Sequence, residues 1–138
     1  MKERIVLDTN CLILSLPPQS RYHATWEAIV RGDCVLCVSN EILEEYEEII
    51  GRFWGSDIAD YVINVIVNNT TTHLADPFFK FRLIAANPDD NKFVDCAITS
   101  NVRYIVTEDR HFDVLRQIDF PKVDVIGIDD FLEEMEKR

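Results

Sequence analysis

The sequence predicts an α/β fold in which a mostly parallel sheet is covered by helices on both faces. Short apolar runs alternate with helical patterns along the chain, which is the pattern of parallel sheets. The predicted strands are almost continuously apolar, which is typical of strands buried on both faces. The chain has 138 residues, of which 47% are hydrophobic. That length is enough for one domain with a core, so we expect a single domain over residues 1–138.

The first half of the chain contains two expected strands and three expected helices. Pro17 and Pro18 end whatever element follows the first strand, and Gly32 ends the next helix. Ser39 and Asn40 provide a helix cap. In order, we expect a strand at 5–7, a helix at 23–30, a strand at 34–38, and helices at 41–50 and 56–67.

The second half of the chain is less regular. Residues 68–77 read as a polar loop or a short strand, and the pattern at 78–86 is ambiguous. The turn Asn87-Pro88 precedes another helical pattern. We then expect a helix at 90–101, strands at 104–106 and 124–126, and a final helix at 129–136.

Composition excludes some classes of protein. No apolar run approaches the roughly 20 residues of a membrane helix, and the charged start of the chain does not resemble a signal peptide. We therefore expect a cytoplasmic protein. The formal net charge of -11 counts against long-range attraction to a nucleic acid. Cys34 and Cys37 have the C-x-x-C spacing but no second ligand pair, which favours buried free thiols.

Acidic side chains follow the predicted strands. Asp8 follows the first strand, and Glu108 and Asp109 follow the strand at 104–106. Ligands of open parallel sheets bind beyond the carboxyl ends of the strands. Helices that follow strands begin at the same edge, so the acids near the starts of the helices at 41–50 and 90–101 belong to it too.

Helical phase selects among these acids. In the helix at 41–50, Glu45 and Glu47 flank the apolar face, and Glu45 lies nearer the helix start. In the helix at 90–101, Asp90 lies close to the centre of the apolar stripe, whereas Asp89 and Asp95 lie off it. The sequence therefore indicates a group made up of Asp8, Glu45, Asp90 and Asp109.

Four converging carboxylates raise one another's pKa unless cations are bound. Mg²⁺ or Mn²⁺ would relieve this repulsion, activate water and stabilise a displacement at phosphorus. Taken singly, each acid reads as a helix cap, a turn residue or part of a solvated face, so only their joint placement indicates a site. His23, His73 and His111 lack ligand spacing and are expected to be structural or exposed.

Four segments resemble, in order, the motifs of PIN domains. The first motif is a strand that ends in Asp and is followed by Thr and Asn, and the second is a Ser before a helix that bears one Glu. The third motif centres on an Asp. The last is a strand followed by Thr-x-Asp and an aromatic residue. They occupy residues 5–10, 39–46, 87–93 and 104–112. The sequence is most similar to the bacterial branch described as toxins of toxin–antitoxin pairs.

This resemblance implies a three-layer α/β/α sandwich and Mg²⁺- or Mn²⁺-dependent cleavage of RNA. It implies that Asp8, Glu45, Asp90 and Asp109 bind the metal directly or through water. It also implies that Thr9 and Asn10 orient Asp8 and that Thr107 supports the site. An antitoxin protein and a homodimer are the partners that it suggests.

Several alternatives stay open. Lys92 and Arg110 adjoin site residues, so we predict that they contact RNA phosphates. A non-catalytic PIN-like scaffold that binds RNA or a protein is the alternative function. A haloacid-dehalogenase-type phosphatase ranks lower, because that chemistry needs a second Asp where Asn10 stands. Glu108 and Asp95 add carboxylates that the motifs do not require, and no role for Cys11 follows from the sequence.

Overall fold

The computed structural model describes residues 2–137, so Met1 and Arg138 of the predicted domain lie outside the described residues. The extent of the domain, residues 1–138, stays a prediction. The strands are β1 (Arg4–Leu7), β2 (Val35–Val38), β3 (His73–Leu74), β4 (Tyr104–Val106) and β5 (Val125–Ile126). The α-helices are α1 (Thr9–Ser15), α2 (His23–Arg31), α3 (Asn40–Trp54), α4 (Ser56–Asn68), α5 (Asn91–Ser100) and α6 (Ile128–Glu136). Two 3₁₀ segments are η1 (Pro88–Asp90) and η2 (Arg110–Gln117).

The strands form one sheet in the order β3-β2-β1-β4-β5, and every neighbouring pair is parallel. The central strand β1 is therefore flanked by β2 and β4. Its last residue, Leu7, is paired with Val106, the last residue of β4. The residues that follow these two strands consequently leave the sheet side by side at its carboxyl edge.

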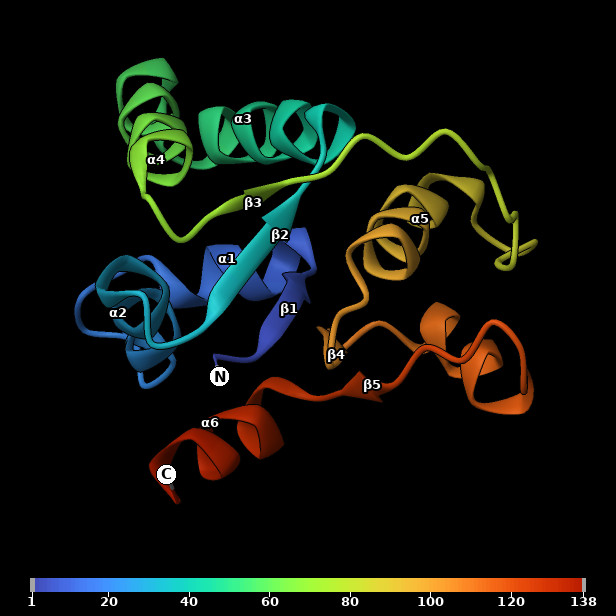
Figure 1. Ribbon diagram of the computed structural model, residues 1–138. Coiled ribbons are helices and arrows are strands. Elements are labelled where there is room, and N and C mark those ends of the chain that lie inside the picture. The colour runs from blue at the N-terminus through green and yellow to red at the C-terminus, as the bar shows by residue number, and fades with distance from the viewer. Residues whose placement is uncertain (1, 138) are drawn as a thin grey trace.

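The helices cover both faces of this sheet (Figure 1), and the α/β class and three-layer arrangement are confirmed. The chain moves from β1 to β2 to β3 in one direction and then crosses back to β4. Because parallel crossovers are right-handed in nearly all proteins, this reversal puts α5 on the opposite face from α1 and α2. Helix α5 packs against β1, β2 and β4, while α3 and α4 form a helical pair.

The core lies between the sheet and these helices. Ile5, Val6 and Leu7 of β1 are completely buried, as the continuous apolar pattern predicts. The largest fully buried side chains are Tyr46, Phe93, Phe112 and Phe131. All four cysteines lie within the described residues, are buried and form no disulfide, which agrees with the interpretation of the C-x-x-C pair.

Two segments were not predicted. Helix α1 begins directly after β1, where the Asp8 carboxylate caps it by accepting from the backbone NH of Asn10. The 3₁₀ segment η2 is capped in the same way by Asp109. Both elements begin at acids that the sequence marked as site residues, and capping is the local effect that starts them.

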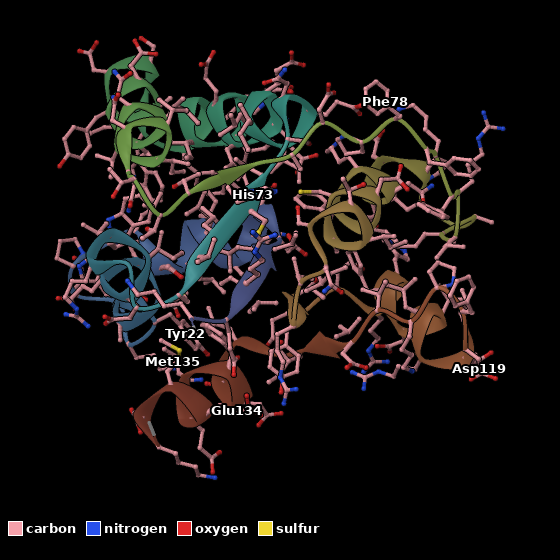
Figure 2. The ribbon with its side chains drawn as sticks, viewed as in Figure 1. Tyr22, His73, Phe78, Asp119, Glu134 and Met135 are labelled. Atoms are coloured by element: carbon pink, nitrogen blue, oxygen red, sulfur yellow. The ribbon has the colours of Figure 1, made fainter. Side chains whose placement is uncertain are left out.

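The remaining differences are small. The loop-or-strand segment at 68–77 contains the edge strand β3. Helix α5 begins one residue later than predicted, because Pro88 opens the 3₁₀ turn η1 just before it. Helix α6 lies near the start of α2, because the hydroxyl of Tyr22, labelled in Figure 2, donates to Asp129 of α6 at 3.4 Å. Over residues 2–137, no helix has both the length and the apolar character that crossing a membrane requires.

Candidate functional site

The candidate site lies at the carboxyl edge of the sheet, where β1 and β4 end. Asp8 continues the pairing of these strands, because its backbone NH donates to the Val106 carbonyl at 3.0 Å. Thr107, the next residue after β4, donates its own NH to Ile126 of β5 at 3.0 Å. Asp8 and Thr107 are thus held by sheet hydrogen bonds, and their side chains meet beyond the strand ends.

Asp8 is almost fully buried, with 6% of its surface exposed. One carboxylate oxygen accepts from the backbone NH of Asn10 at 2.9 Å, and the other accepts from the Thr107 hydroxyl. Burial raises the pKa of Asp8, and the nearby carboxylates of Asp109 and Glu45 raise it further, against these two hydrogen bonds. Asn10 thus orients Asp8 through its backbone, whereas its side chain is exposed.

Thr107 joins two of the predicted site residues. Its hydroxyl donates to Asp8 and accepts from the backbone NH of Asp109 at 3.0 Å. Asp109 in turn accepts from the backbone NH of His111 at 2.9 Å. One threonine hydroxyl therefore fixes the relative position of Asp8 and the start of η2.

Glu45 reaches the site from α3, the helix that Ser39 caps by accepting from the Ile42 NH at 3.3 Å. The Thr9 hydroxyl donates to one Glu45 oxygen. The other Glu45 oxygen lies 2.8 Å from the Lys92 ammonium. Thr9 was expected to orient Asp8, but its side chain contacts Glu45 instead.

Asp90 reaches the site from the start of α5. Its Oδ2 atom is buried and has no well-formed hydrogen bond among the described residues, although His111 Nδ1 lies 3.4 Å away. Burial raises the pKa of Asp90 to about 6, with further contributions from Asp109 and Asp8 and an opposing one from His111. The neighbouring Asp89 is exposed, so the helical phase separates the two correctly.

His111 is the site residue that sequence reasoning missed. Its Nδ1 atom lies 3.1 Å from an Asp109 oxygen and 3.4 Å from Asp90 Oδ2. Ligand atoms of Asp90, Asp109 and His111 all lie within 4.8 Å of one another. The lack of ligand spacing among the histidines hid this arrangement; the position of His111 two residues after Asp109 was the available signal.

The two predicted RNA-contacting cations differ in environment. The Lys92 side chain is only 15% exposed and is paired with Glu45, so it points into the site. Arg110 is exposed and lines a separate hollow of about 190 Å³ beside Thr107 and Asp109. Their roles stay predictions.

Three residues without an assigned role are now placed. Asp95 is buried, contrary to the helical-phase prediction, because residues 78–86 cover α5. Its carboxylate accepts from the Phe81 NH of that segment at 3.1 Å. It lies outside the metal-ligand group of Asp90, Asp109 and His111. Glu108 is exposed next to Gly127. Cys11 is fully buried, and burial raises the pKa of its thiol, which argues against a reactive thiolate.

The chemistry of these side chains fits a divalent cation. Carboxylate oxygens are the ligands that Mg²⁺ and Mn²⁺ prefer. The buried Asp90 Oδ2 has no well-formed hydrogen bond among the described residues, and a cation would satisfy it. The pKa values of Asp8 and Asp90 are raised first by burial and then by neighbouring carboxylates, and bound positive charge would offset both effects.

Comparison with known proteins gives a family and a fold. The family model of the PIN domain matches residues 4–111. The structure is similar to VapBC2 from Rickettsia felis bound to a DNA fragment of its promoter, with a TM-score of 0.62, 13% identity, and coverage of 90% of this chain and 98% of that chain. It is also similar to DNA-bound VapBC from Salmonella typhimurium, with a TM-score of 0.57, 12% identity, and coverage of 93% and 99%.

A third similar structure is PAE2754 from Pyrobaculum aerophilum, with a TM-score of 0.59 at 12% identity, covering 99% of this chain and 91% of that chain. No curated protein matches the chain. At these identities the structural similarities establish the fold. The family match spans most of the chain and includes the segments that carry Asp8, Glu45, Asp90 and Asp109. The chain therefore belongs to the PIN-domain family.

Proposed function

We propose that this PIN-domain protein is a metal-dependent endoribonuclease that hydrolyses RNA phosphodiester bonds. PIN domains are generally nucleases, and the observation that carries the proposal is the convergence of four acids. Asp8 and Asp109 follow neighbouring strands of the sheet, while α3 and α5 contribute Glu45 and Asp90. All four acids occur in the segment that matches the family.

Each residue has a distinct task in this proposal. Asp8 would hold a divalent cation in an orientation set by the Asn10 NH and the Thr107 hydroxyl. Asp90 and Asp109 would provide the neighbouring oxygen ligands, and Glu45 would act directly or through water. A Mg²⁺ or Mn²⁺ ion bound there supplies a Lewis acid and an activated water for attack at phosphorus.

Cleavage of single-stranded RNA by the purified protein, with Mn²⁺, Mg²⁺ or EDTA, tests the proposal. Asp8→Asn and Glu45→Gln should abolish the metal-dependent cleavage, because each removes one negative ligand with little change in shape. Glu44→Gln is the matched control: it changes the adjacent, exposed glutamate of the same helix and should leave cleavage unchanged. Cleavage that persists in EDTA, or in Asp8→Asn, would refute the metal mechanism.

A non-catalytic PIN-like scaffold is the alternative, and one observation favours it. Lys92 already pairs with Glu45, and a protonated His111 would pair with both Asp90 and Asp109. These internal cations could balance the acids without a metal. A scaffold of this kind would bind its partner equally well with and without metal and would show no turnover.

The toxin role belongs to the same proposal. Two of the similar structures are VapBC complexes bound to DNA, and we infer from them that this chain is the toxin of a toxin–antitoxin pair, with an antitoxin protein as partner. A cytoplasmic location and a homodimer stay predictions. Expression of the chain alone should arrest growth, and Asp8→Asn should remove the arrest; growth unaffected by the active protein would contradict the toxin role.

A further inference from the structure

A run of exposed aromatic and basic side chains lies between β3 and α5. The rings of Phe78 and Phe79 are 93% and 69% exposed, and Lys80 and Arg82 are also exposed. Figure 2 shows Phe78 on the outer side of this segment, away from the sheet. We call residues 78–82 the aromatic-basic strip. Two adjacent exposed phenylalanines form an apolar patch, which makes the strip a candidate binding surface.

The strip and the residues after it are held in place by two polar side chains of α5, the buried Asp95 and the half-buried Asn91. Asp95 accepts from the Phe81 NH at 3.1 Å. Asn91 accepts from the Ile84 NH at 2.9 Å and donates to the Ile84 carbonyl at 3.0 Å. The strip has no regular secondary structure, so these bonds replace a sheet or helix ladder. They give Asp95 a role that the motifs did not provide.

The rings of the strip are also pre-arranged. Phe79 and Phe81 contact each other with their centroids 5.0 Å apart and their planes tilted by 42°. The aliphatic residues that follow turn inward: Leu83 is half-buried and Ile84 is fully buried. The outer surface of the strip is therefore made of rings and cations, without the aliphatic side chains that would extend it into a wider apolar patch.

The strip leads to the candidate site. A cavity of about 430 Å³ beside it is lined by three basic side chains, Lys80, Arg82 and Lys92, and by three acidic ones, Glu41, Asp89 and Asp95. At its inner end, Lys92 lies 2.8 Å from Glu45. Lys80 is paired with Glu41 at 3.3 Å. In a chain with a formal net charge of -11, a cavity in which three basic side chains balance three acidic ones repels a polyanion less than the rest of the surface does.

We propose that the aromatic-basic strip binds single-stranded RNA and leads it to the carboxylate site. Unpaired bases stack on exposed rings, and cations beside the rings pair with the phosphates, which is how proteins hold single strands without reading sequence. Duplex RNA hides the faces of its bases, so the rings select unpaired RNA. The inference rests on the proposed ribonuclease function and assigns the surface that binds its RNA.

Fluorescence anisotropy with a labelled single-stranded RNA in EDTA tests the strip separately from cleavage. Phe78→Ala/Phe79→Ala should weaken binding by at least about tenfold, the range expected for lost base stacking. Phe120→Ala is the matched control, since this ring is 91% exposed and lies after η2, away from the strip in the chain. It should leave the affinity unchanged. Thermal unfolding of each variant shows that the fold is retained.

A second variant tests the cations. Lys80→Gln/Arg82→Gln should weaken binding and reduce its dependence on salt concentration, because fewer counterions are released. The proposal would be overturned if the wild type and the Phe78/Phe79 variant bound single-stranded RNA with equal affinity. The same result is expected if the rings bind a protein instead of RNA. Equal affinity for single-stranded and duplex RNA would also overturn the proposal.

The two proposals can fail separately. Ring-dependent RNA binding without cleavage in Mn²⁺ would support the strip and refute the nuclease. Metal-dependent cleavage with ring-independent binding would support the nuclease and refute the strip.

Discussion

Replacing Asp90 by asparagine should stabilise the metal-free protein while removing its response to metal. The pKa of Asp90 is raised from 3.8 to about 6, mainly by burial. Protonated Asp90 therefore contributes to the free energy of unfolding. This contribution is complete below about pH 4 and is lost as the pH rises through about 6. At about 1.4 kcal/mol per pH unit, ionisation of Asp90 at pH 8 costs about 2 to 3 kcal/mol. Asparagine has nearly the same shape and carries no charge, so it avoids that cost.

Urea denaturation of the wild type and Asp90→Asn in EDTA at pH 8 measures this difference. We expect a gain of about 2 kcal/mol in the free energy of unfolding, which decreases as the pH falls toward 4. Mn²⁺ should stabilise the wild type and have much less effect on the variant. Asp89→Asn is the matched control, since the exposed neighbouring carboxylate should give no gain. A loss of stability in metal-free Asp90→Asn would show that the reasoning about Asp90 is wrong.

Three further substitutions test a contact within the site and two features of the surrounding fold. Thr107→Val removes the hydroxyl that donates to Asp8. We expect the free energy of unfolding in urea to fall by about 1–3 kcal/mol and Mn²⁺ binding in calorimetry to weaken. Unchanged metal affinity would refute the positioning role of Thr107. Tyr46→Phe removes the buried hydroxyl that donates to the Leu7 carbonyl, and should cost about 1–2 kcal/mol in the same denaturation assay. Gly32→Ala forces a side chain onto a backbone with a φ of 77°, and should lower the free energy of unfolding by about 1 kcal/mol or more.

Much of the fold follows from local pattern. The apolar strands at β1, β2 and β4 and the amphipathic helices α3 and α4 were predictable because their sequence periods match their burial. Helix α1 was not, because its seven residues are too short for a clear period and depend on the Asp8 cap and on packing against α2 and α3.

The site was predictable to the extent that it depends on topology. Any Asp directly after a central parallel strand lies at the carboxyl edge, and helical phase separated Glu45 from Glu44. Helical phase misplaced Asp95. The phase identifies only the face of α5 that turns toward the sheet, and it does not indicate that residues 78–86 cover another face of the helix. The contact of His111 with Asp90 depends on how η2 and α5 approach each other, which no local pattern encodes.

The charge of the chain and its proposed substrate are compatible once distance is considered. At physiological salt, exposed charges separated by more than about 8 Å are largely screened, so a net charge of -11 weakly opposes the approach of RNA. The local field at the point of contact then decides binding, and there Lys80, Arg82 and Lys92 line one cavity in which they balance Glu41, Asp89 and Asp95. A bound divalent cation would also reduce the negative charge of the cluster. RNA affinity should therefore rise when metal is added, as measured with Ca²⁺ or with an uncleavable RNA, and an affinity that falls with metal would mean that the RNA does not reach the cluster.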